Sequence, residues 1–215
     1  MCFSAEMSFG AGVVLTTIGV ITTRKAKPNQ VFFACIPLLF GIQQITEGFI
    51  WVIHNTDKFS YLLSYLNFIY LFFAFIIWPI WIPFSILKLK GNTNEKFVKF
   101  ALGLGIIVSL SLGNMLFFYK INSEILCYHI KYSVTYVKPF KYYYPIIEIS
   151  YLIAISLPAF LHNSRSIKIF SVLLVFSYFM SKWIYTNYFT SVWCFFAAII
   201  SIFVYYSLSE INSKT

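Results

Sequence analysis

Seven apolar stretches, each close to the length of a membrane-crossing helix, dominate this sequence. A helix needs about 20 residues to cross the hydrocarbon core of a bilayer. Most of the connections between the stretches are short and contain the Gly, Pro, Asn and Ser typical of helix ends and turns. The stretches lie approximately at residues 8–23, 31–53, 61–87, 97–118, 145–161, 167–184 and 189–208. The sequence therefore predicts an all-α membrane protein, with one seven-helix transmembrane domain over residues 1–215.

The composition agrees with this fold class and disfavours soluble ones. The chain is 60% hydrophobic and 11% charged, whereas an average soluble domain is about 25% charged. A net charge of +9 would suggest nucleic-acid binding in a soluble protein. Here most Lys and Arg residues lie between the apolar stretches, where they orient helices and meet anionic head groups. We therefore expect membrane lipid, and not nucleic acid, as a partner.

The distribution of basic residues predicts an orientation. With seven crossings, ten Lys and Arg residues fall on one side and six on the other, and four of those six lie in one long connection. Because basic residues favour the cytoplasmic side, we expect the N-terminus outside and the C-terminus in the cytoplasm. No Lys or Arg precedes Arg24, so the first stretch is predicted to be a retained helix and not a signal peptide.

The long connection between the fourth and fifth helices, residues 119–144, has its own pattern. Aromatic and β-branched residues recur at every second position from Tyr128 to Tyr136. A period of two favours a strand or a hairpin, and an interfacial helix is the alternative. Either element would lie at the outer ends of the helices, as a lid or as a simple anchor in the head-group layer.

The second helix carries the clearest polar group within an apolar stretch. Gln43 and Gln44 precede Glu47 by one turn, and Trp51 and His54 continue the same face. An ionisable side chain at membrane depth is costly unless it is paired or hydrated, which makes it a candidate functional residue. We expect Glu47 to face the bundle and to touch polar atoms from at least two other segments. A purely structural clamp between helices is the alternative.

Other candidate residues lie on the same predicted side. Glu148 opens the fifth helix, and Lys182 near the outer end of the sixth could pair with either glutamate or reach the surface. His129 in the long connection is a second possible cation for Glu47. Trp193 begins the seventh helix. We predict a ligand-binding set and list it here: Gln43, Gln44, Trp51, Glu148, Lys182 and Trp193.

Cysteine, histidine and glutamate on this side allow a metal site. Cys2, Glu47, His129 and Cys194 are donor types that bind zinc or copper, although no local spacing forms a metal motif. A disulfide between Cys2 and Cys194 is another interpretation, and an apolar plug at the N-terminus is a third. If Met1 were removed, Cys2 would present an N-terminal thiol suited to nucleophilic chemistry. We expect Cys2 near Trp193, and no cofactor is identified.

Four motifs in order resemble a known family. They are MCFSA at residues 1–5, PLLFGIQQ at 37–44 followed by Glu47 and Trp51, WPIWIP at 78–83, and SVWCFFAA at 191–198. Together they resemble a family of bacterial integral-membrane proteins that is catalogued as a domain of unknown function. The resemblance covers nearly the whole chain and implies a seven-helix protein of the bacterial inner membrane. It supplies no activity and no catalytic residue.

The sequence leaves three classes of function open. The leading hypothesis is an outward-opening site around Glu47, either an enzyme or a binding site for a lipid or small molecule. Glu47 would be the acid/base or cation ligand, with His129 as its partner. Gln43 and Gln44 would orient Glu47, and Trp51 would line the pocket. A ligand sensor or small transporter is the second class, and an accessory structural subunit is the third.

Overall fold

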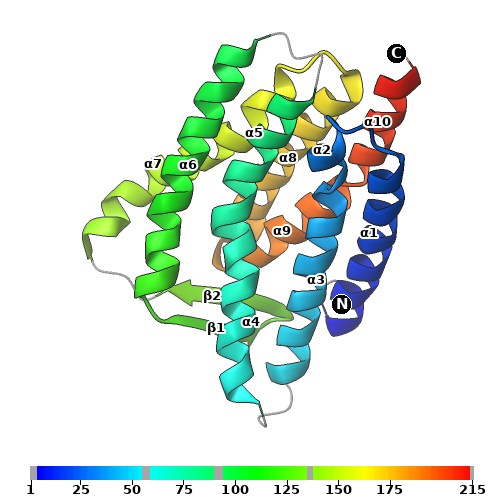
Figure 1. The fold of residues 1–215 in the computed structure, drawn as a ribbon. Helices are drawn as coiled ribbons and strands as arrows, with labels where there is room; N and C mark the ends of the chain where they lie inside the picture. Colours follow the sequence, from blue (N-terminus) through cyan, green and yellow to red (C-terminus); the bar gives the residue numbers. More distant parts are fainter. Residues whose placement is uncertain (1–3, 55–58, 90–93, 135–137, 214–215) are drawn as a thin grey trace.

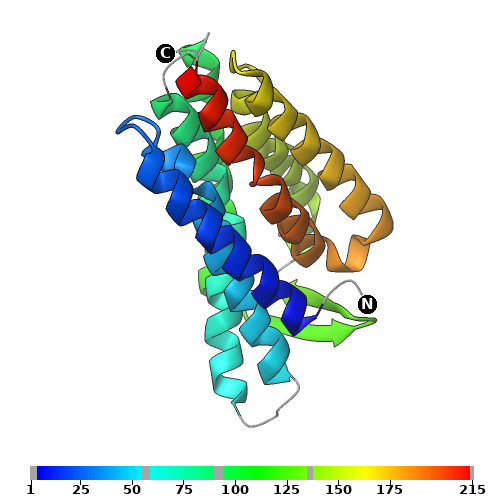
Figure 2. The same cartoon turned by 90° about the vertical axis from the view of Figure 1, so that its right-hand side faces the viewer.

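The computed structural model describes residues 4–54, 59–89, 94–134 and 138–213. Within these ranges, seven helices are long and apolar enough to cross a membrane, and they coincide with the seven predicted stretches. Figures 1 and 2 show that the two ends of the described chain lie at opposite ends of the bundle, as seven crossings require. The expected helical architecture is confirmed.

Four of these spans are continuous helices, and the other three are interrupted. The continuous spans are α1 (Ala5–Lys25), α6 (Glu95–Phe118), α7 (Lys138–Phe160) and α8 (Arg165–Ile184). The interrupted spans are α2 with α3 (Val31–Ala34, Ile36–His54), α4, η1 and α5 (Ser60–Phe72, Phe73–Ile77, Trp78–Lys88), and α9 with α10 (Phe189–Ile200, Phe203–Ser213). A short 3-10 turn, η2 (Thr186–Tyr188), leads into α9. Because α7 begins at Lys138, part of the predicted long connection is helical.

The bundle has two chemically different ends. The hairpin end holds the start of α1, the end of α3, the start of α4 and a β-hairpin (Figure 1). The basic end holds the last turn of α1 with Arg24 and Lys25, the last turn of α5 with Lys88, and the C-terminus. These are the two sides into which the basic residues were sorted.

Glycines let α1 lie directly against α3, as Figure 2 shows. A Cβ on Gly19 would collide with the backbone of Leu38, and one on Gly41 would collide with the Thr16 hydroxyl. Small residues that permit close backbone approach are the usual interface of helices that pack in a bilayer, where burial away from lipid gives no driving force. The first two spans therefore form a tightly fitted pair.

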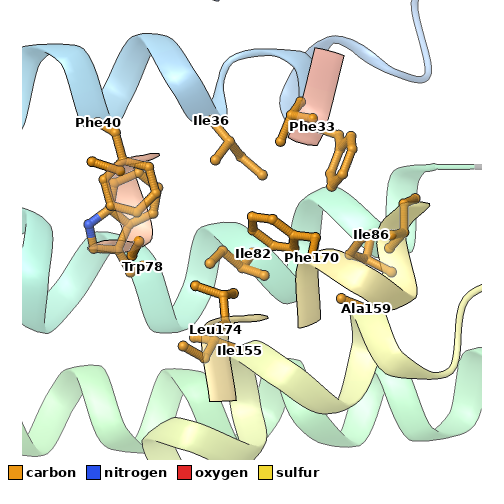
Figure 3. Packing of buried hydrophobic residues seen from close by; sticks show 14 of the residues in the cluster. Phe33, Ile36, Phe40, Trp78, Ile82, Ile86, Ile155, Ala159, Phe170 and Leu174 are labelled. Carbon is orange, nitrogen blue, oxygen red and sulfur yellow. The ribbon is translucent and has the colours of Figure 1, made fainter. Parts of the chain in front are cut away.

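The interior away from the hairpin end is a core of packed aromatic and aliphatic side chains (Figure 3). Phe40 of α3 stacks on Trp78 of α5, with ring centroids 3.8 Å apart and planes inclined by 18°. Phe170 of α8 and Ile155 of α7 complete this cluster and are each at most 2% exposed. Dispersion contacts of this kind hold the second, third, fifth and sixth spans together.

The third span changes its helical winding at η1, a π-helical turn. The cause lies at Pro79, which has no N–H to donate and whose ring crowds the preceding turn. Side chains satisfy the carbonyls there: the Tyr151 hydroxyl donates to Ala74 O at 2.7 Å, and the Ser109 hydroxyl donates to Ile76 O at 3.0 Å. The wider turn is thereby tied to α6 and α7, next to the site described below.

A β-hairpin occupies the connection where a period of two was noted. Strands β1 (Ile121–Leu126) and β2 (His129–Val134) pair antiparallel, with Leu126 opposite His129. The two loop residues, Cys127 and Tyr128, have φ values of 50° and 62°, as a two-residue type I′ turn demands. The predicted strand is confirmed up to residue 134, and the alternative interfacial helix is wrong for these residues. Residues 135–137 lie outside the described part.

Polar contacts fix the hairpin across the helix ends. The Ser123 hydroxyl of β1 lies 2.8 Å from His54 Nε2 of α3 and accepts a hydrogen bond of 2.8 Å from Asn67 Nδ2 of α4. Ile130 on β2 is fully buried against α9 and its neighbours. The hairpin is therefore part of the packed structure and forms one wall of the polar site.

Candidate functional site

Glu47 lies on the inner face of α3, and only 2% of the residue is exposed. The hydroxyl of Ser191, in the first turn of α9, donates a hydrogen bond of 2.6 Å to Glu47 Oε1. Tyr70 of α4 and Tyr132 of β2 also interact electrostatically with this carboxyl group. The prediction that Glu47 faces the bundle and meets polar atoms from at least two other segments is confirmed. The bonded partner is a serine and not a cation.

Gln43, one turn before Glu47, has a complete set of partners. Its Oε1 accepts a hydrogen bond of 2.8 Å from the Trp78 indole. Its Nε2 donates to the Tyr70 carbonyl oxygen at 3.4 Å and to Cys194 Sγ at 3.5 Å. Gln43 therefore joins α3 to α4, α5 and α9, and it has the contacts of a structural clamp.

Gln44 and two tyrosines have incomplete surroundings. Gln44 and Tyr70 are both 0% exposed, and the Tyr132 ring stacks on the Tyr70 ring at 4.8 Å between centroids. The Gln44 amide and both tyrosine hydroxyls are buried without a well-aligned hydrogen-bond partner among the described residues. All three side chains lie close enough to Glu47 to interact with it. We call Gln44, Glu47, Tyr70, Tyr132 and Ser191 the Glu47 chamber.

A cavity of about 40 Å³ lies beside this chamber, between α7, α8, α9 and η1. By volume it has room for about three water molecules or for part of a ligand. Half of its lining residues are aromatic, and Glu148 joins them from α7. We call it the aromatic pocket and define it by Tyr144, Tyr151, Tyr178, Phe189, Trp193 and Cys194.

Trp193 is the central side chain of the aromatic pocket. Its ring lies 5.5 Å from the ring of Tyr151 and 5.3 Å from those of Tyr178 and Phe189, between centroids. The residue is 8% exposed, and its indole N–H is buried with no acceptor in the described part of the chain. A buried donor without an acceptor is costly, so an acceptor atom that reached this N–H would remove that cost.

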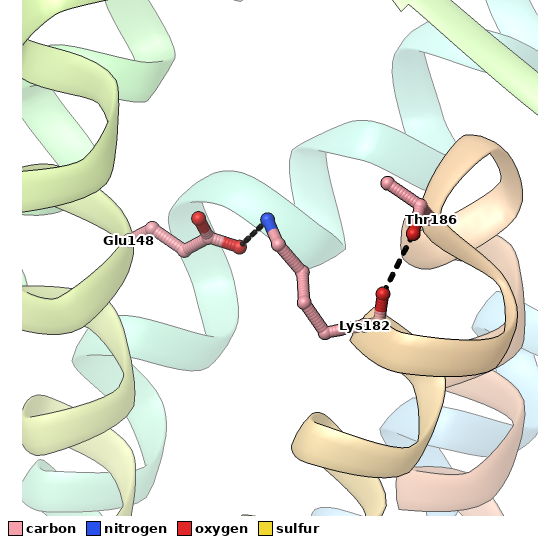
Figure 4. Close-up of polar contacts among 3 residues, drawn as sticks. All are labelled: Glu148, Lys182 and Thr186. Atoms are coloured by element: carbon pink, nitrogen blue, oxygen red, sulfur yellow. Dashed lines mark hydrogen bonds and ion pairs between the residues drawn. The ribbon is translucent and has the colours of Figure 1, made fainter.

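An ion pair connects the two helices beside the pocket (Figure 4). Lys182 Nζ of α8 lies 2.6 Å from Glu148 Oε1 of α7. The Lys182 side chain is 41% exposed, and that of Glu148 is 13% exposed. The ammonium also lies 5.2 Å from the centre of the Phe189 ring. Of the two glutamates expected as partners of Lys182, the structure selects Glu148.

Cys194 lies between the chamber and the pocket. It lines the aromatic pocket, and its sulfur accepts the hydrogen bond from Gln43. The next turn of α9 towards its N-terminus carries Ser191, which bonds Glu47. One helix turn thus supplies groups to both sites, and the two sites share a wall.

Two other predicted site residues are not hydrogen-bonded to Glu47 in the described part of the chain. Trp51 is 6% exposed and packs in the same buried cluster as Tyr70, Leu71 and Cys194, beside the chamber. His129 stacks near Tyr185 and Tyr188, with centroids 5.0 and 4.9 Å apart, and its Nδ1 lies 2.7 Å from the Cys127 carbonyl oxygen. His129 and Tyr132 lie on opposite faces of β2, because they are three residues apart on the strand. The tyrosine and not the histidine therefore reaches the chamber.

The metal and disulfide hypotheses both involve Cys2, which lies outside the described residues, as does most of the MCFSA motif. In the residues that are described, no group of three or more His, Cys, Asp or Glu side chains gathers as metal ligands would. Cys35, Cys127 and Cys194 are free thiols there. The remaining polar groups of the site would offer mostly oxygen atoms as metal ligands.

Sequence reasoning found Glu47 and the two glutamines but missed both tyrosines of the chamber. For Tyr132 a signal existed: the alternation along residues 128–136 placed it on the same strand face as Ile130 and opposite His129. Tyr70 had no comparable signal, because it is one of many aromatic residues in an evenly apolar helix. Its position depends on how α4 packs against α3 and β2.

Comparison with known proteins gives a family but no activity. No curated protein and no solved structure matches the chain. The family model that does match, over residues 1–214, is described as a family of unknown function, DUF6629. The resemblance noted from the four motifs is therefore confirmed, and this seven-helix chain belongs to the DUF6629 family.

Proposed function

We propose that this chain is a multi-pass membrane protein whose aromatic pocket binds one part of a lipid or of another small amphipathic molecule. The observation that carries the proposal is that Trp193 lines the cavity and that its buried indole N–H has no acceptor among the described residues. Ligand sites are typically apolar, with a few placed polar groups that fix orientation. The pocket has this composition.

The pocket also defines what its ligand must offer. An acceptor atom would meet the Trp193 N–H, and apolar groups would pack on Tyr151 and Tyr178. A polar or charged group of the ligand would lie at Glu148 and Lys182, because this ion pair is more exposed than Trp193. Apolar side chains on the same helices, such as Ile149 and Phe179, are more than half exposed. These positions support entry from the bilayer, between α7 and α8.

Binding is favoured over catalysis because the expected acid and base have different surroundings. Glu47 is buried behind Ser191, whereas His129 lies against Tyr185 and Tyr188 outside the chamber. General acid–base catalysis requires both groups within hydrogen-bond reach of one substrate. The ligand-binding role assigned to Glu148, Lys182 and Trp193 needs no such approach.

Photocrosslinking of the purified protein with a diazirine-labelled phospholipid tests the proposal. Trp193→Phe removes the N–H but keeps an aromatic ring, and we expect it to lower labelling of α7 to α9 about tenfold, as the loss of one hydrogen bond allows. Trp183→Phe is the matched control, since Trp183 is 82% exposed and lies outside the pocket. Equal labelling of wild type and Trp193→Phe would contradict the proposed site.

The ion pair allows a second, charge-based arm of the same experiment. The double variant Glu148→Gln with Lys182→Gln should weaken labelling by a lipid with a charged head group more than labelling by a neutral diacylglycerol. Glu95→Gln with Lys99→Gln is the control, because that pair lies 2.8 Å apart on the surface of α6. Similar losses of labelling for both lipids would contradict the assignment of the head group to Glu148 and Lys182.

We further propose that the hairpin end faces outward and the basic end faces the cytoplasm of a bacterial cell. The support is the excess of Lys and Arg at the basic end. A phosphatase fused after residue 215 should be inactive, because it folds only outside the cytoplasm, whereas a fluorescent protein at the same site should mature. An active phosphatase would reverse the orientation.

A further inference from the structure

The Glu47 chamber contains more unsatisfied polar groups than helix packing explains. The carboxyl group receives one well-aligned hydrogen bond, from Ser191, and it lies close enough to Gln44 and Tyr70 for weaker ones. The Gln44 amide and the hydroxyls of Tyr70 and Tyr132 lie around it without well-aligned partners in the described residues. Burying polar groups in this way costs free energy for each group left unpaired. Gln43 next to them shows that the same helix can satisfy an amide completely.

We propose that the Glu47 chamber binds a single sodium ion. Its potential ligands are all oxygen atoms: a Glu47 carboxylate oxygen, the Gln44 amide oxygen and the hydroxyl oxygens of Tyr70, Tyr132 and Ser191. They come from α3, α4, β2 and α9. Small hard cations prefer carboxylate, carbonyl and hydroxyl oxygens. This inference rests on the chamber alone and is independent of the lipid-binding proposal.

The charge of the chamber selects a monovalent ion. Glu47 is its one carboxylate, and the ion pairs of the described chain lie elsewhere, at Lys99 with Glu95 and Lys182 with Glu148. One sodium ion neutralises one carboxylate, whereas a divalent ion would leave a buried positive charge without a partner. The nearby sulfur of Cys194 already accepts a hydrogen bond from Gln43. The donor set therefore disfavours soft metals as well.

A bound ion would join elements that are distant in the sequence. Tyr132 belongs to the hairpin, Ser191 to the last span, and Gln44 and Glu47 to the second. Because all four groups would contact the same ion, its removal would loosen the hairpin from α3 and α9 together. The thermal stability of the folded chain should consequently depend on sodium.

The test is a melting series on the full chain in detergent. Sodium chloride is raised from about 1 to about 300 mM while choline chloride keeps the ionic strength constant, so that general salt effects cancel. We expect the melting temperature to rise with sodium, by about 5 °C at a hundred-fold excess over Kd. Equilibrium binding of radioactive sodium should approach one ion per chain.

Three variants connect the response to the chamber. Glu47→Gln keeps the shape and removes the charge, and it should abolish both the melting response and sodium binding. Tyr132→Phe keeps the stacked ring and removes one oxygen, so it should weaken sodium binding about tenfold. Glu95→Gln is the matched control, because that carboxylate is exposed on α6, and it should respond as wild type does.

Several results would overturn the proposal. One is a wild-type melting temperature that is the same in sodium and in choline, which would mean a neutral carboxyl group with water around it. Another is a sodium response that survives in Glu47→Gln. If Glu47→Gln does not fold, wild-type affinity in Tyr132→Phe decides against the site. Loss of lipid labelling in Trp193→Phe leaves the sodium response unchanged, so the two proposals fail separately.

Discussion

Two glutamates at opposite ends of the bundle have very different surroundings. Near the basic end, Glu210 Oε2 accepts hydrogen bonds from the Ser164 hydroxyl at 3.0 Å, the Ser166 hydroxyl at 2.6 Å and the Ser166 N–H at 3.1 Å. It thereby caps the first turn of α8, where a negative charge is favoured. Glu47 accepts one well-aligned hydrogen bond, among polar groups that have no well-aligned partner in the described residues. A structural carboxylate is completed by its own chain, and we infer that the chamber is completed by a ligand.

Gln43→Leu should have the largest effect, because it removes a fully bonded group. It leaves the Trp78 indole N–H without its acceptor and ends the link from α3 to Cys194. We expect a loss of about 3 kcal/mol in the free energy of unfolding, measured by denaturant titration in mixed micelles. Gln43→Glu, which retains an acceptor for Trp78, should lose less if the indole bond dominates. Unchanged stability in Gln43→Leu would show that the clamp is unimportant.

Glu210→Ala should come next, at about 2 kcal/mol, since three donors at the start of α8 lose one acceptor. The same unfolding titration measures it. Glu210→Gln keeps one acceptor oxygen and serves as the control. Neither variant touches the chamber, so both should retain the wild-type response to sodium. Loss of the sodium response in Glu210→Ala would contradict the separate structural and binding roles assigned to the two glutamates.

Gln44→Leu should cost less than about 1 kcal/mol when sodium is absent, because the described residues give Gln44 no well-aligned hydrogen bond that the substitution would break. In sodium the difference from wild type should grow, since the variant lacks one proposed ligand oxygen. Adjacent residues of one helix, Gln43 and Gln44, would then separate a structural role from a binding role. A large loss for Gln44→Leu without sodium would indicate that its amide is structural.

The smallest expected effect is a pH dependence at the basic end. His162 is 2% exposed, and its Nδ1 accepts the Ser164 N–H at 3.0 Å. Burial lowers the pKa of His162 and nearby Lys168 lowers it further, whereas Glu210 acts in the opposite direction. In the unfolded chain a histidine has a pKa of about 6.5, so the unfolded state binds a proton first as the pH falls. Stability should therefore decline below about pH 6.5.

His162→Asn checks this assignment, because Oδ1 can replace Nδ1 as the acceptor and does not titrate. The melting temperature of the variant should be less dependent on pH than that of wild type between about pH 7 and 5. Identical slopes for the two proteins would assign the pH dependence to another group. At the hairpin end, the response to sodium should be the same in both.

The sequence predicted the parts of this protein that follow from local patterns. Apolar length placed seven spans, and a period of two placed β2. The buried face around Glu47 followed from helical spacing. The sequence did not predict the π turn before Pro79 or the start of α7 at Lys138, because both depend on how neighbouring elements supply hydrogen bonds. The glutamate for Lys182 was left open, since spacing along one helix does not reveal which helix lies beside it.

The site was only half predictable for the same reason. Gln43, Gln44 and Glu47 lie within one helix, so their common face could be read from the chain. Tyr70 and Tyr132 enter from separate elements, and their meeting is a property of the tertiary packing. His129 was predicted as the partner of Glu47 because of its side-chain chemistry. Which residues of β2 face the chamber depends instead on the phase of the strand, and that phase places Tyr132 there.

The hydrogen bond from Ser191 to Glu47 joins residues 144 positions apart, and this separation has a consequence for biosynthesis. At about 5–20 residues per second, a ribosome completes α9 roughly 7–30 s after α3. The second span thus exists long before its serine. In that interval the carboxyl group has Gln44 beside it, and then Tyr70 once the third span is made. A nascent chain released before α9 would lack the residue that closes the chamber.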